Sequence, residues 1–598
     1  MNNQHRFFIS NGDCKLSENK TVFYLALFTF FAFFFLLGAR PFYGSDEIRV
    51  AAISLSFDVN DNWFIGAVNG RMFVHKPPLY FWLNGLIFRF FDADFYTSRI
   101  VSAFSASLNV IFSYLLARKM KFSRESALLS SVILISCAQF FMTGRSIIID
   151  VFLSMTIGLC WLSFYALETH LAAKDKGYLK ISIWSFLLII GFAAGIMSKG
   201  LVGLIVPLSG IGIWMLWDLF FATKKIRWSL WIILTICVLL SFIPTAWWCV
   251  LLYQTYGYKS FKEVVIDNNF GRFLGPLMKY TPDHKEAFYY YLAVLHELFT
   301  PWIFFVPFMI FYYYKQLRKK VDKRLIYLIL IFIVPFILFN ISSGKRRLYL
   351  LPLYMPLAIM FGEFIFQMFK DSEKLSKQRF FLQKFFFYFV SVLPFILPIA
   401  YTVLLIIVLV KNVVETYEIV CVCVASLVLC LYTIYIFFKK NFFIYLLLIA
   451  ANTVLILIWS NDLIRTSYQN KKESYIPLEK KLEEIERNGH EIILINARER
   501  LASAVVFFRH HNVIEGGLNN ESGRVVRHIF NPTLGKKLHI NDLDECYFLI
   551  VENDAFAKKY NLIEADRMRI GSSRLVFYCL NPAIKDKSKA KIIMELGL

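Results

Sequence analysis

Apolar stretches of about 20 residues alternate with short polar segments along most of the chain, and each is long enough to cross a bilayer as a helix. The first, TVFYLALFTFFAFFFLLGA from Thr21, lacks a clear small-residue cleavage site, so we interpret it as a retained membrane helix. Basic clusters recur between the stretches, at residues 6–20, 118–124, 174–180, 224–227, 315–324, 370–384 and 439–440. Because basic loops stay in the cytoplasm, this alternation predicts roughly thirteen spans and a cytoplasmic N-terminus.

One apolar segment, KPPLYFWLNGLIFRFF from Lys76, is predicted to lie along the outer surface of the membrane instead of crossing it. Pro77 and Pro78 lack a backbone N–H but are tolerated in a first helical turn, so a helix is expected to begin there. The segment is short and carries Arg89, and a crossing would put the next basic cluster on the wrong side. The first outer loop, residues 41–94, is therefore expected to contain surface helices.

The composition changes sharply after Trp459. PLEKKLEEIERNG places Leu478, Leu482 and Ile485 on one face of a helix and ends in Asn-Gly, a good C-cap. EIILINA, AVVFF, YFLIV and RLVFYCL are predicted to be strands. The tail is therefore expected to be a small α/β domain.

The predicted fold class is a polytopic α-helical membrane protein that carries a C-terminal α/β domain. Residues 1–460 form the membrane domain, and residues 461–598 form the second domain. An odd number of spans places that second domain outside the cytoplasm. There Cys546 and Cys579 could form a disulfide, although sequence cannot show that they are close.

The composition agrees with a membrane protein. The chain has 598 residues, of which 58% are hydrophobic and 18% aromatic, and its mean hydropathy is +0.54. Its formal net charge of +22 could suggest a nucleic-acid partner. The lysines and arginines instead follow the membrane topology, so we expect membrane lipids and no nucleic acid as partners.

Ionisable residues gather at the outer ends of the predicted spans, where they are costly unless paired or functional. They are Asp46, Glu47, Arg49, His75, Lys76, Arg145, Asp150, Lys199, Arg272, Lys345, Arg346, Arg347 and, with them, Tyr349. This convergence on one face is the main evidence in the sequence for a site.

Several of these residues have a purely structural alternative. Asp46 and Arg49 could form a simple i, i+3 helix pair, and Arg145 and Asp150 could be an ion pair that caps a span. Lys199 could snorkel, although its place between two apolar runs favours a buried partner.

The KRR triplet at residues 345–347 could contact lipid headgroups. His75 is more often a surface histidine than a ligand, because no second histidine stands at ligand spacing.

One carboxylate pair facing several cations is typical of a phosphate-bearing substrate. Lys76, Arg272 and Lys345 could neutralise the phosphate, and Tyr349 could donate a hydrogen bond to it. Asp46 could then orient or deprotonate an acceptor. Glu47, Arg49, Arg145, Asp150, Lys199 and Arg346 would support this site.

The order DEIR, KPPLYFW, GRSIIID, SKG, FGRF, PW and KRRLYLLPLY resembles the bacterial aminoarabinose transferases of lipid A modification. These are GT-C glycosyltransferases related to protein O-mannosyltransferases. The resemblance covers residues 39–356. It implies a polyprenyl-phosphate-linked sugar donor, transfer at the outer side of the bacterial inner membrane, Asp46 at the reaction centre, and Lys76, Arg272 and Tyr349 on the donor phosphate.

The sequence departs from that family at two positions. Members commonly have a glutamate before the KPP lysine and a histidine before NF, a pair proposed to bind a divalent metal. Here these places hold His75 and Asn268. A divalent metal stays an open alternative, with His75 as its candidate ligand.

Three functions fit these patterns. The first is an inverting glycosyltransferase that moves a sugar, such as 4-amino-4-deoxy-L-arabinose, from a polyprenyl phosphate to lipid A or another glycolipid. The second is a protein O-glycosyltransferase, in which Asp46 would act as a genuine base. The third is a flippase of lipid-linked sugars without chemistry, which ranks last because the charged residues gather at one face.

Overall fold

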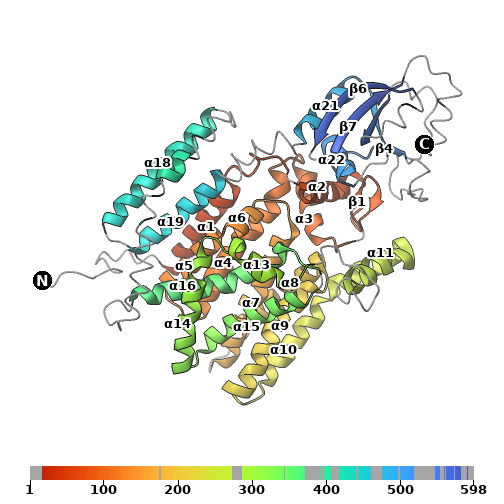
Figure 1. The fold of residues 1–598 in the computed structure, drawn as a ribbon. Helices are drawn as coiled ribbons and strands as arrows, with labels where there is room; N and C mark the ends of the chain where they lie inside the picture. The colour runs from red at the N-terminus through yellow and green to blue at the C-terminus, as the bar shows by residue number, and fades with distance from the viewer. Residues whose placement is uncertain are drawn as a thin grey trace. The chain divides into compact units, whose positions relative to one another are not determined.

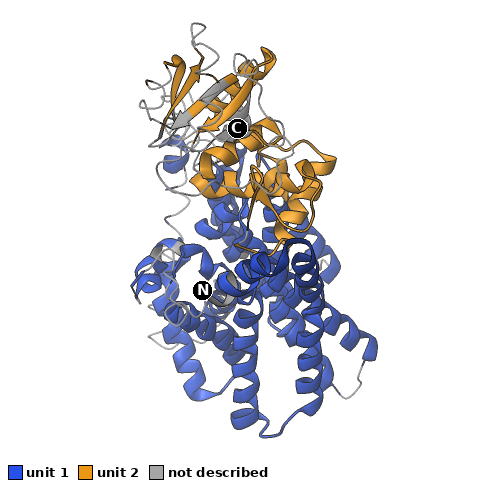
Figure 2. Cartoon of the chain, turned by 90° about the vertical axis from the view of Figure 1, so that its right-hand side faces the viewer, with its two compact units in different colours: residues 1–36, 101–464 blue, residues 37–100, 465–598 orange. Residues whose placement is uncertain are grey.

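The computed structural model divides the chain into two compact units (Figure 2). Unit 1 comprises residues 1–36 and 101–464, and unit 2 comprises residues 37–100 and 465–598. The structure describes residues 17–42, 44–73, 75–173, 177–271, 286–287, 289–342, 344–370, 392, 396, 398–403, 406, 416–439, 442–459, 475–495, 499–516, 546–551, 558, 561–570, 573–580 and 589.

Unit 1 is helical throughout its described part (Figure 1). Its first helices are α1 (Glu18–Phe34), α4 (Ile100–Lys119), α5 (Arg124–Ser136), α6 (Ala138–Gly144), α7 (Ile149–Ala172), α8 (Tyr178–Lys199), α9 (Val202–Trp217), η2 (Asp218–Ala222), α10 (Trp228–Ser241), α11 (Ile243–Phe261) and η3 (Lys262–Gly271). They are followed by α13 (Tyr290–Leu298), η5 (Trp302–Phe305), α14 (Val306–Lys319), α15 (Lys323–Ile341), η6 (Arg347–Leu353), α16 (Tyr354–Lys370), α18 (Thr416–Phe438) and α19 (Phe442–Ile458).

Among the described residues, seven helices are long and apolar enough to cross a membrane. An eighth span results if α5 and α6, which meet at a 70° bend, form one broken span. The chain is therefore a multi-pass membrane protein. The predicted count of about thirteen spans is not confirmed by this part of the chain.

Polar side chains define several helix starts in unit 1. The hydroxyl of Ser17 accepts from the Lys20 N–H at 3.4 Å, and that of Ser123 accepts from the Ser126 N–H at 3.1 Å. Asp322 caps α15 by accepting from the Arg324 N–H at 2.9 Å. Each cap satisfies a backbone donor that the first helical turn leaves free.

Small residues let the membrane helices approach closely. A Cβ on Gly203 of α9 would meet the backbone of Gly195 of α8 at 2.1 Å. Gly200, between the two helices, has φ +66°. A Cβ on Gly210 would likewise meet the backbone of Ile331 of α15 at 2.8 Å. Such contacts are typical of helix pairs in membranes, because dispersion and close packing hold them together.

The first part of unit 2 is the predicted outer loop. It contains α2 (Gly44–Val59), β1 (Ala67–Val68), β2 (Arg71–Met72), α3 (Leu79–Phe90) and η1 (Thr97–Arg99). Helix α3 begins directly after Pro77 and Pro78, as predicted, and Pro78 is its N-cap. At 12 residues, α3 is about 18 Å long and too short to cross a bilayer.

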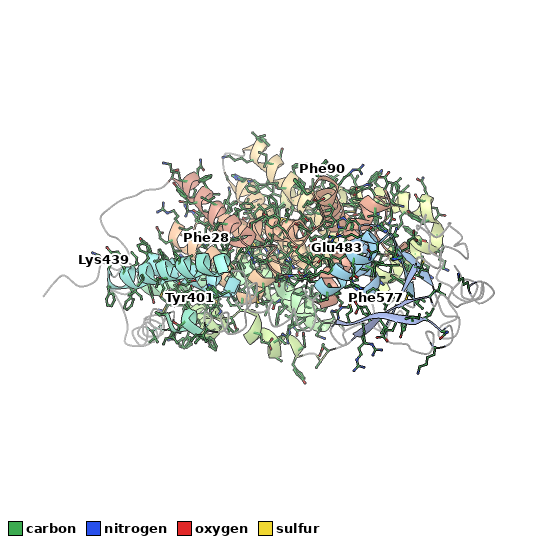
Figure 3. All side chains as sticks on the ribbon, turned by 90° about the horizontal axis from the view of Figure 1, so that it is seen from above. Phe28, Phe90, Tyr401, Lys439, Glu483 and Phe577 are labelled. Atoms are coloured by element: carbon green, nitrogen blue, oxygen red, sulfur yellow. The ribbon has the colours of Figure 1, made fainter. Side chains whose placement is uncertain are left out.

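The second part of unit 2 contains α21 (Ile476–Arg487), β3 (Glu491–Ile495), α22 (Glu499–Arg509), β4 (Ile514–Gly516), β5 (Cys546–Val551), β6 (Ile563–Ile570) and β7 (Ser573–Cys579). The described strands form one mixed sheet in the order β4-β3-β5-β7-β6. Strands β4, β3 and β5 run parallel, whereas β7 is antiparallel to both β5 and β6. Phe577 of β7, labelled in Figure 3, is fully buried.

Three of the four predicted strands coincide with β3, β5 and β7. Helix α21 buries Leu478, Leu482 and Ile485, as predicted, and exposes Glu483 on its other face (Figure 3). The prediction of a strand over AVVFF was wrong, because this segment lies in α22. Residues 501–507 of α22 are buried on every side, and a short run without a polar face has no period that separates helix from strand. Cys546 and Cys579 are free thiols.

The first loop and the C-terminal region pack together within unit 2. The rings of Phe42 and Phe507 are 5.0 Å apart, and the Asn512 amide donates to Asn60 Oδ1 at 2.6 Å. The Val513 N–H donates to the buried Asn69 Oδ1 at 2.8 Å. Residues 41–94, which we predicted as part of the membrane domain, therefore group with the C-terminal region in the structure.

Candidate functional site

Asp46 lies in the first turn of α2, half-exposed. Arg49 Nη2 donates to Asp46 Oδ1 at 2.7 Å, so the i, i+3 pair suggested by the sequence is present. The other terminal nitrogen of Arg49 lies 3.7 Å from a carboxylate oxygen of Glu499, the first residue of α22. Asp46 is therefore oriented by an arginine that the C-terminal region also contacts.

The neighbouring Glu47 is buried in a different environment. Its carboxylate accepts two hydrogen bonds from Arg40, at 2.7 and 3.0 Å, and one from Arg99 Nε at 3.4 Å. Arg99 is fully buried and also donates to the carbonyls of Leu37, Arg40 and Pro41. This Arg40–Glu47–Arg99 network joins the two ends of the first loop. A supporting role of Glu47 in the site stays a prediction.

Sequence reasoning missed Arg40 and Arg99 as partners. They flank the loop 59 positions apart, and no local pattern connects them. The only signal available was that both arginines stand next to predicted spans and far from the basic clusters.

His75 and Lys76 lie three and two residues before Pro78, the N-cap of α3. Lys76 is partly exposed, and His75 is exposed with its ring 5.3 Å from that of Phe73. The first N–H groups of α3 carry the positive end of the helix dipole, so Lys76 adds its charge where an anion is already favoured. Within the described part of the chain, no group of three His, Cys, Asp or Glu is suited to a metal ion.

In unit 1, Lys199, Asp150 and Tyr349 come together from three elements. Lys199 ends α8 and forms a salt bridge with Asp150 in the first turn of α7. Its ammonium nitrogen also lies 4.2 Å from the centroid of the Tyr349 ring, in η6. The Lys199 and Asp150 side chains are only 13% and 7% exposed, so the buried partner predicted for Lys199 is Asp150.

Arg145 is fully buried and serves the end of α1. Its guanidinium donates to the carbonyls of Ala32 and Phe33 at 3.0 and 2.8 Å, and to that of Phe35 at 2.7 Å. These carbonyls have no partner inside α1 because they lie in its last turn. Arg145 therefore caps the C-terminal end of α1.

The side chains of the KRR segment, residues 345–347, differ in their exposure to solvent. Lys345 is 4% exposed, and its ammonium donates to the carbonyls of Ser342 and Glu286, at 2.7 and 3.2 Å. The Arg346 carbonyl accepts from the Tyr291 hydroxyl at 3.4 Å, while Arg347 forms an exposed ion pair with Glu297. These contacts hold the turn that leads into Tyr349.

Some predicted residues lie outside the description. Arg272 is outside the described residues, and so is the side chain of Asn268. Within unit 1 the structure brings Asp150, Lys199 and Tyr349 together. Within unit 2 it brings Asp46 and Arg49 together and, separately, Glu47 with its two arginines.

Comparison with known proteins gives consistent relatives. Residues 19–257 match the family model of dolichyl-phosphate-mannose-protein mannosyltransferase. An undecaprenyl phosphate-alpha-4-amino-4-deoxy-L-arabinose arabinosyl transferase from Erwinia tasmaniensis is 28% identical over 347 residues, which are 56% of this chain and 58% of the relative. A Proteus mirabilis protein of the same description, numbered 2, is 27% identical over 343 residues, 57% of this chain and 58% of the relative.

The crystal structure of ArnT from Cupriavidus metallidurans bound to undecaprenyl phosphate has the same fold. It superposes with a TM-score of 0.67 at 15% identity, covering 94% of this chain and 98% of that chain. The sequence alignments span little more than half the length of the curated relatives. The resemblance found from the motifs is confirmed, and the fold of ArnT extends over 94% of this chain.

Proposed function

We propose that this chain is an inverting glycosyltransferase that moves 4-amino-4-deoxy-L-arabinose from undecaprenyl phosphate to lipid A, at the periplasmic side of the bacterial inner membrane. The observation that carries the proposal is the Lys199–Asp150–Tyr349 cluster at helix ends of a membrane unit whose fold matches that of ArnT. Ionisable residues in membrane segments are rare and commonly mark substrate sites, even where they are paired with one another. The names of the relatives supply the sugar and the carrier.

The reaction breaks the bond between the anomeric carbon and the donor phosphate oxygen and forms one from that carbon to the acceptor oxygen. The polyprenyl phosphate leaves with the bonding electrons, so cations near it stabilise the transition state. We assign this role to Lys76, Arg272 and Tyr349, with Lys199 in support. Attack from the opposite face of the sugar inverts the anomeric centre.

Asp46 positions the acceptor in this proposal. A phosphate of lipid A is already anionic, so it needs orientation more than deprotonation. The salt bridge to Arg49 fixes the carboxylate, and the contact from Glu499 fixes Arg49 in turn. We assign Lys345 a supporting role, because its ammonium is engaged by two backbone carbonyls.

Mass spectrometry of lipid A tests the proposal. A strain without its own transferase is complemented with wild type, with Asp46→Asn, or with Asp61→Asn as the matched control. Asp61 is an exposed carboxylate in the same loop, paired only loosely with Arg89 at 3.7 Å. We expect the added sugar with wild type and Asp61→Asn, and a loss of about 100-fold or more with Asp46→Asn. Unmodified lipid A in the strain complemented with the wild-type protein would overturn the proposal.

A protein acceptor is the second candidate, because the matching family model describes protein mannosyltransferases. A serine or threonine hydroxyl must lose a proton during transfer, so Asp46 would then be a base. The same strains distinguish the two acceptors: periplasmic glycoproteins would change while lipid A stays unchanged.

We further propose that the N-terminus is cytoplasmic and that residues 461–598 are periplasmic. A reporter that is active only outside the cytoplasm should be active when fused after residue 459 and inactive when fused after Lys320. The reverse pattern would contradict this orientation.

A further inference from the structure

The end of unit 1 that lies away from Lys199 contains an open groove of about 500 Å³. Its walls are mainly apolar and come from Trp217, Phe221, Leu317, Val321 and Ile326, and Lys323 is the cation that lines it. The groove lies between the end of α9 with η2 and the turn from α14 to α15. Helices α9 and α15 run beside one another (Figure 1).

The groove and the Lys199 cluster lie at opposite ends of the same helices. Helix α9 begins three residues after Lys199, and its continuation η2 ends at Ala222. Helix α15 begins at Lys323 and ends four residues before Lys345. The 21-residue span of α9 and η2 is roughly 31 Å long, which is about the thickness of the hydrocarbon core. The groove is therefore at the other membrane face from Lys199.

A buried carboxylate holds Lys323 at the groove. Asp218 is 3% exposed, and its two oxygens contact Lys323 Nζ at 3.1 Å and Arg227 Nη2 at 3.0 Å. Arg227 also pairs with Glu168. The charges of these four side chains balance one another. The Lys323 side chain is 52% exposed, so N–H groups that Asp218 does not engage remain available for a ligand.

The two turns beside the groove carry a surplus of positive charge. Their exposed basic residues, which form no ion pair with any described residue, are Lys224, Lys225, Arg318, Lys319 and Lys320. Phe220 and Trp228 are exposed beside them, at 64% and 66%. Basic side chains beside exposed aromatic ones are typical of the level of lipid headgroups.

The backbone widens where it borders the groove. Residues 218–222 form a π-helical turn, and the Thr223 N–H donates to the Asp218 carbonyl five residues earlier, at 2.8 Å. The turn is wider than an α-helical one and holds Phe221 and Ala222 on the groove wall. Single π-helical turns are rare and are found frequently at functional sites.

We infer that this groove binds one anionic phospholipid of the surrounding leaflet. The headgroup phosphate lies against Lys323 and the surplus cations, and an acyl chain lies along Trp217, Phe221 and Leu317. A soluble anion would gain nothing from these apolar walls, and a zwitterionic lipid would gain little from the net positive charge. The inference does not depend on the proposed sugar transfer.

Lipid binding by the purified full chain in detergent micelles tests this site. The probes are dioleoyl phosphatidylglycerol and dioleoyl phosphatidylcholine, and bound lipid is counted by native mass spectrometry over a concentration series. We expect wild type to bind phosphatidylglycerol about tenfold more tightly. Lys323→Ala and Leu317→Trp should each reduce that preference to within about twofold. Leu317→Trp fills the groove without touching Asp218.

Lys323→Arg, which keeps the charge, and Lys439→Ala are the controls. Lys439 is an exposed cation after the end of α18 (Figure 3), far along the chain from the groove. Both controls should keep the wild-type preference. Equal binding of the two lipids by wild type, an unchanged preference in Leu317→Trp, or displacement of the lipid by inorganic phosphate alone would each overturn the inference.

Discussion

Asp46 and Glu47 are neighbouring carboxylates in one helical turn, and the structure predicts opposite consequences of neutralising them. Asp46 is 34% exposed and forms a salt bridge with Arg49. Glu47 is 4% exposed and accepts three charge-assisted hydrogen bonds from two arginines. Asp46→Asn should therefore abolish transfer with little effect on folding, whereas Glu47→Gln should unfold the first loop.

The magnitudes follow from burial. A half-exposed pair contributes about 0–1 kcal/mol, so Asp46→Asn should leave stability nearly unchanged. Glu47→Gln removes the negative charge that contacts two buried guanidinium groups, and breaking a buried pair in this way costs about 3–5 kcal/mol. Because about 1.4 kcal/mol is a factor of ten, the open form of the loop should become roughly 100-fold or more populated.

Limited proteolysis in native membrane vesicles measures that population. Cleavage between residues 37 and 100 should be much faster in Glu47→Gln than in wild type, and equally slow in wild type and Asp46→Asn. Sugar transfer is measured on the same vesicles. Slow cleavage of Glu47→Gln, or fast cleavage of Asp46→Asn, would refute the distinction drawn from burial.

Three further predictions use other sites. Lys76→Ala should weaken binding of a short-chain polyprenyl phosphate sugar by about tenfold or more, because a charge-assisted hydrogen bond is lost, and Lys76→Arg should restore binding only in part. An affinity of Lys76→Ala within about twofold of wild type would make Lys76 a surface lysine. Lys199→Met removes the cation that pairs with the buried Asp150 and should cost about 3–5 kcal/mol in thermal unfolding. Adding Asp150→Asn should recover stability but not donor binding, and recovery of both would make the pair purely structural. Burial and the positive charge of Arg509 lower the pKa of His511 below its ordinary 6.5, so the unfolded chain takes up a proton more readily than the folded one. The free energy of unfolding should therefore be highest above pH 6.5 and fall as the pH drops below it. An equal pH dependence in His511→Gln would contradict this.

Local patterns predicted local structure well. The double proline predicted where α3 begins, and the spacing of Leu478, Leu482 and Ile485 predicted α21 with its buried face. AVVFF was misassigned because α22 is buried all round, and a helix without a polar face shows no helical period.

Partnerships across the chain were harder to predict. The isolation of Lys199 in an apolar run predicted a partner, but only the packing of α7 against α8 identifies it as Asp150. Glu47 was grouped with Asp46 as part of the site because adjacent residues share a motif. Its true partners, Arg40 and Arg99, depend on how the loop closes, which no spacing in the sequence records.

The discontinuity of unit 2 has a consequence for the order of biosynthesis. A ribosome that has made the first loop must still make residues 101–464 before the other half of that unit emerges. At about 5–20 residues per second, this takes roughly 20–70 s. During that time the contacts of Phe42, Asn60 and Asn69 with the C-terminal region cannot yet form. The bonds among Arg40, Glu47 and Arg99 lie wholly within residues 37–100, so they can form and hold the two ends of this segment together before the C-terminal region is made.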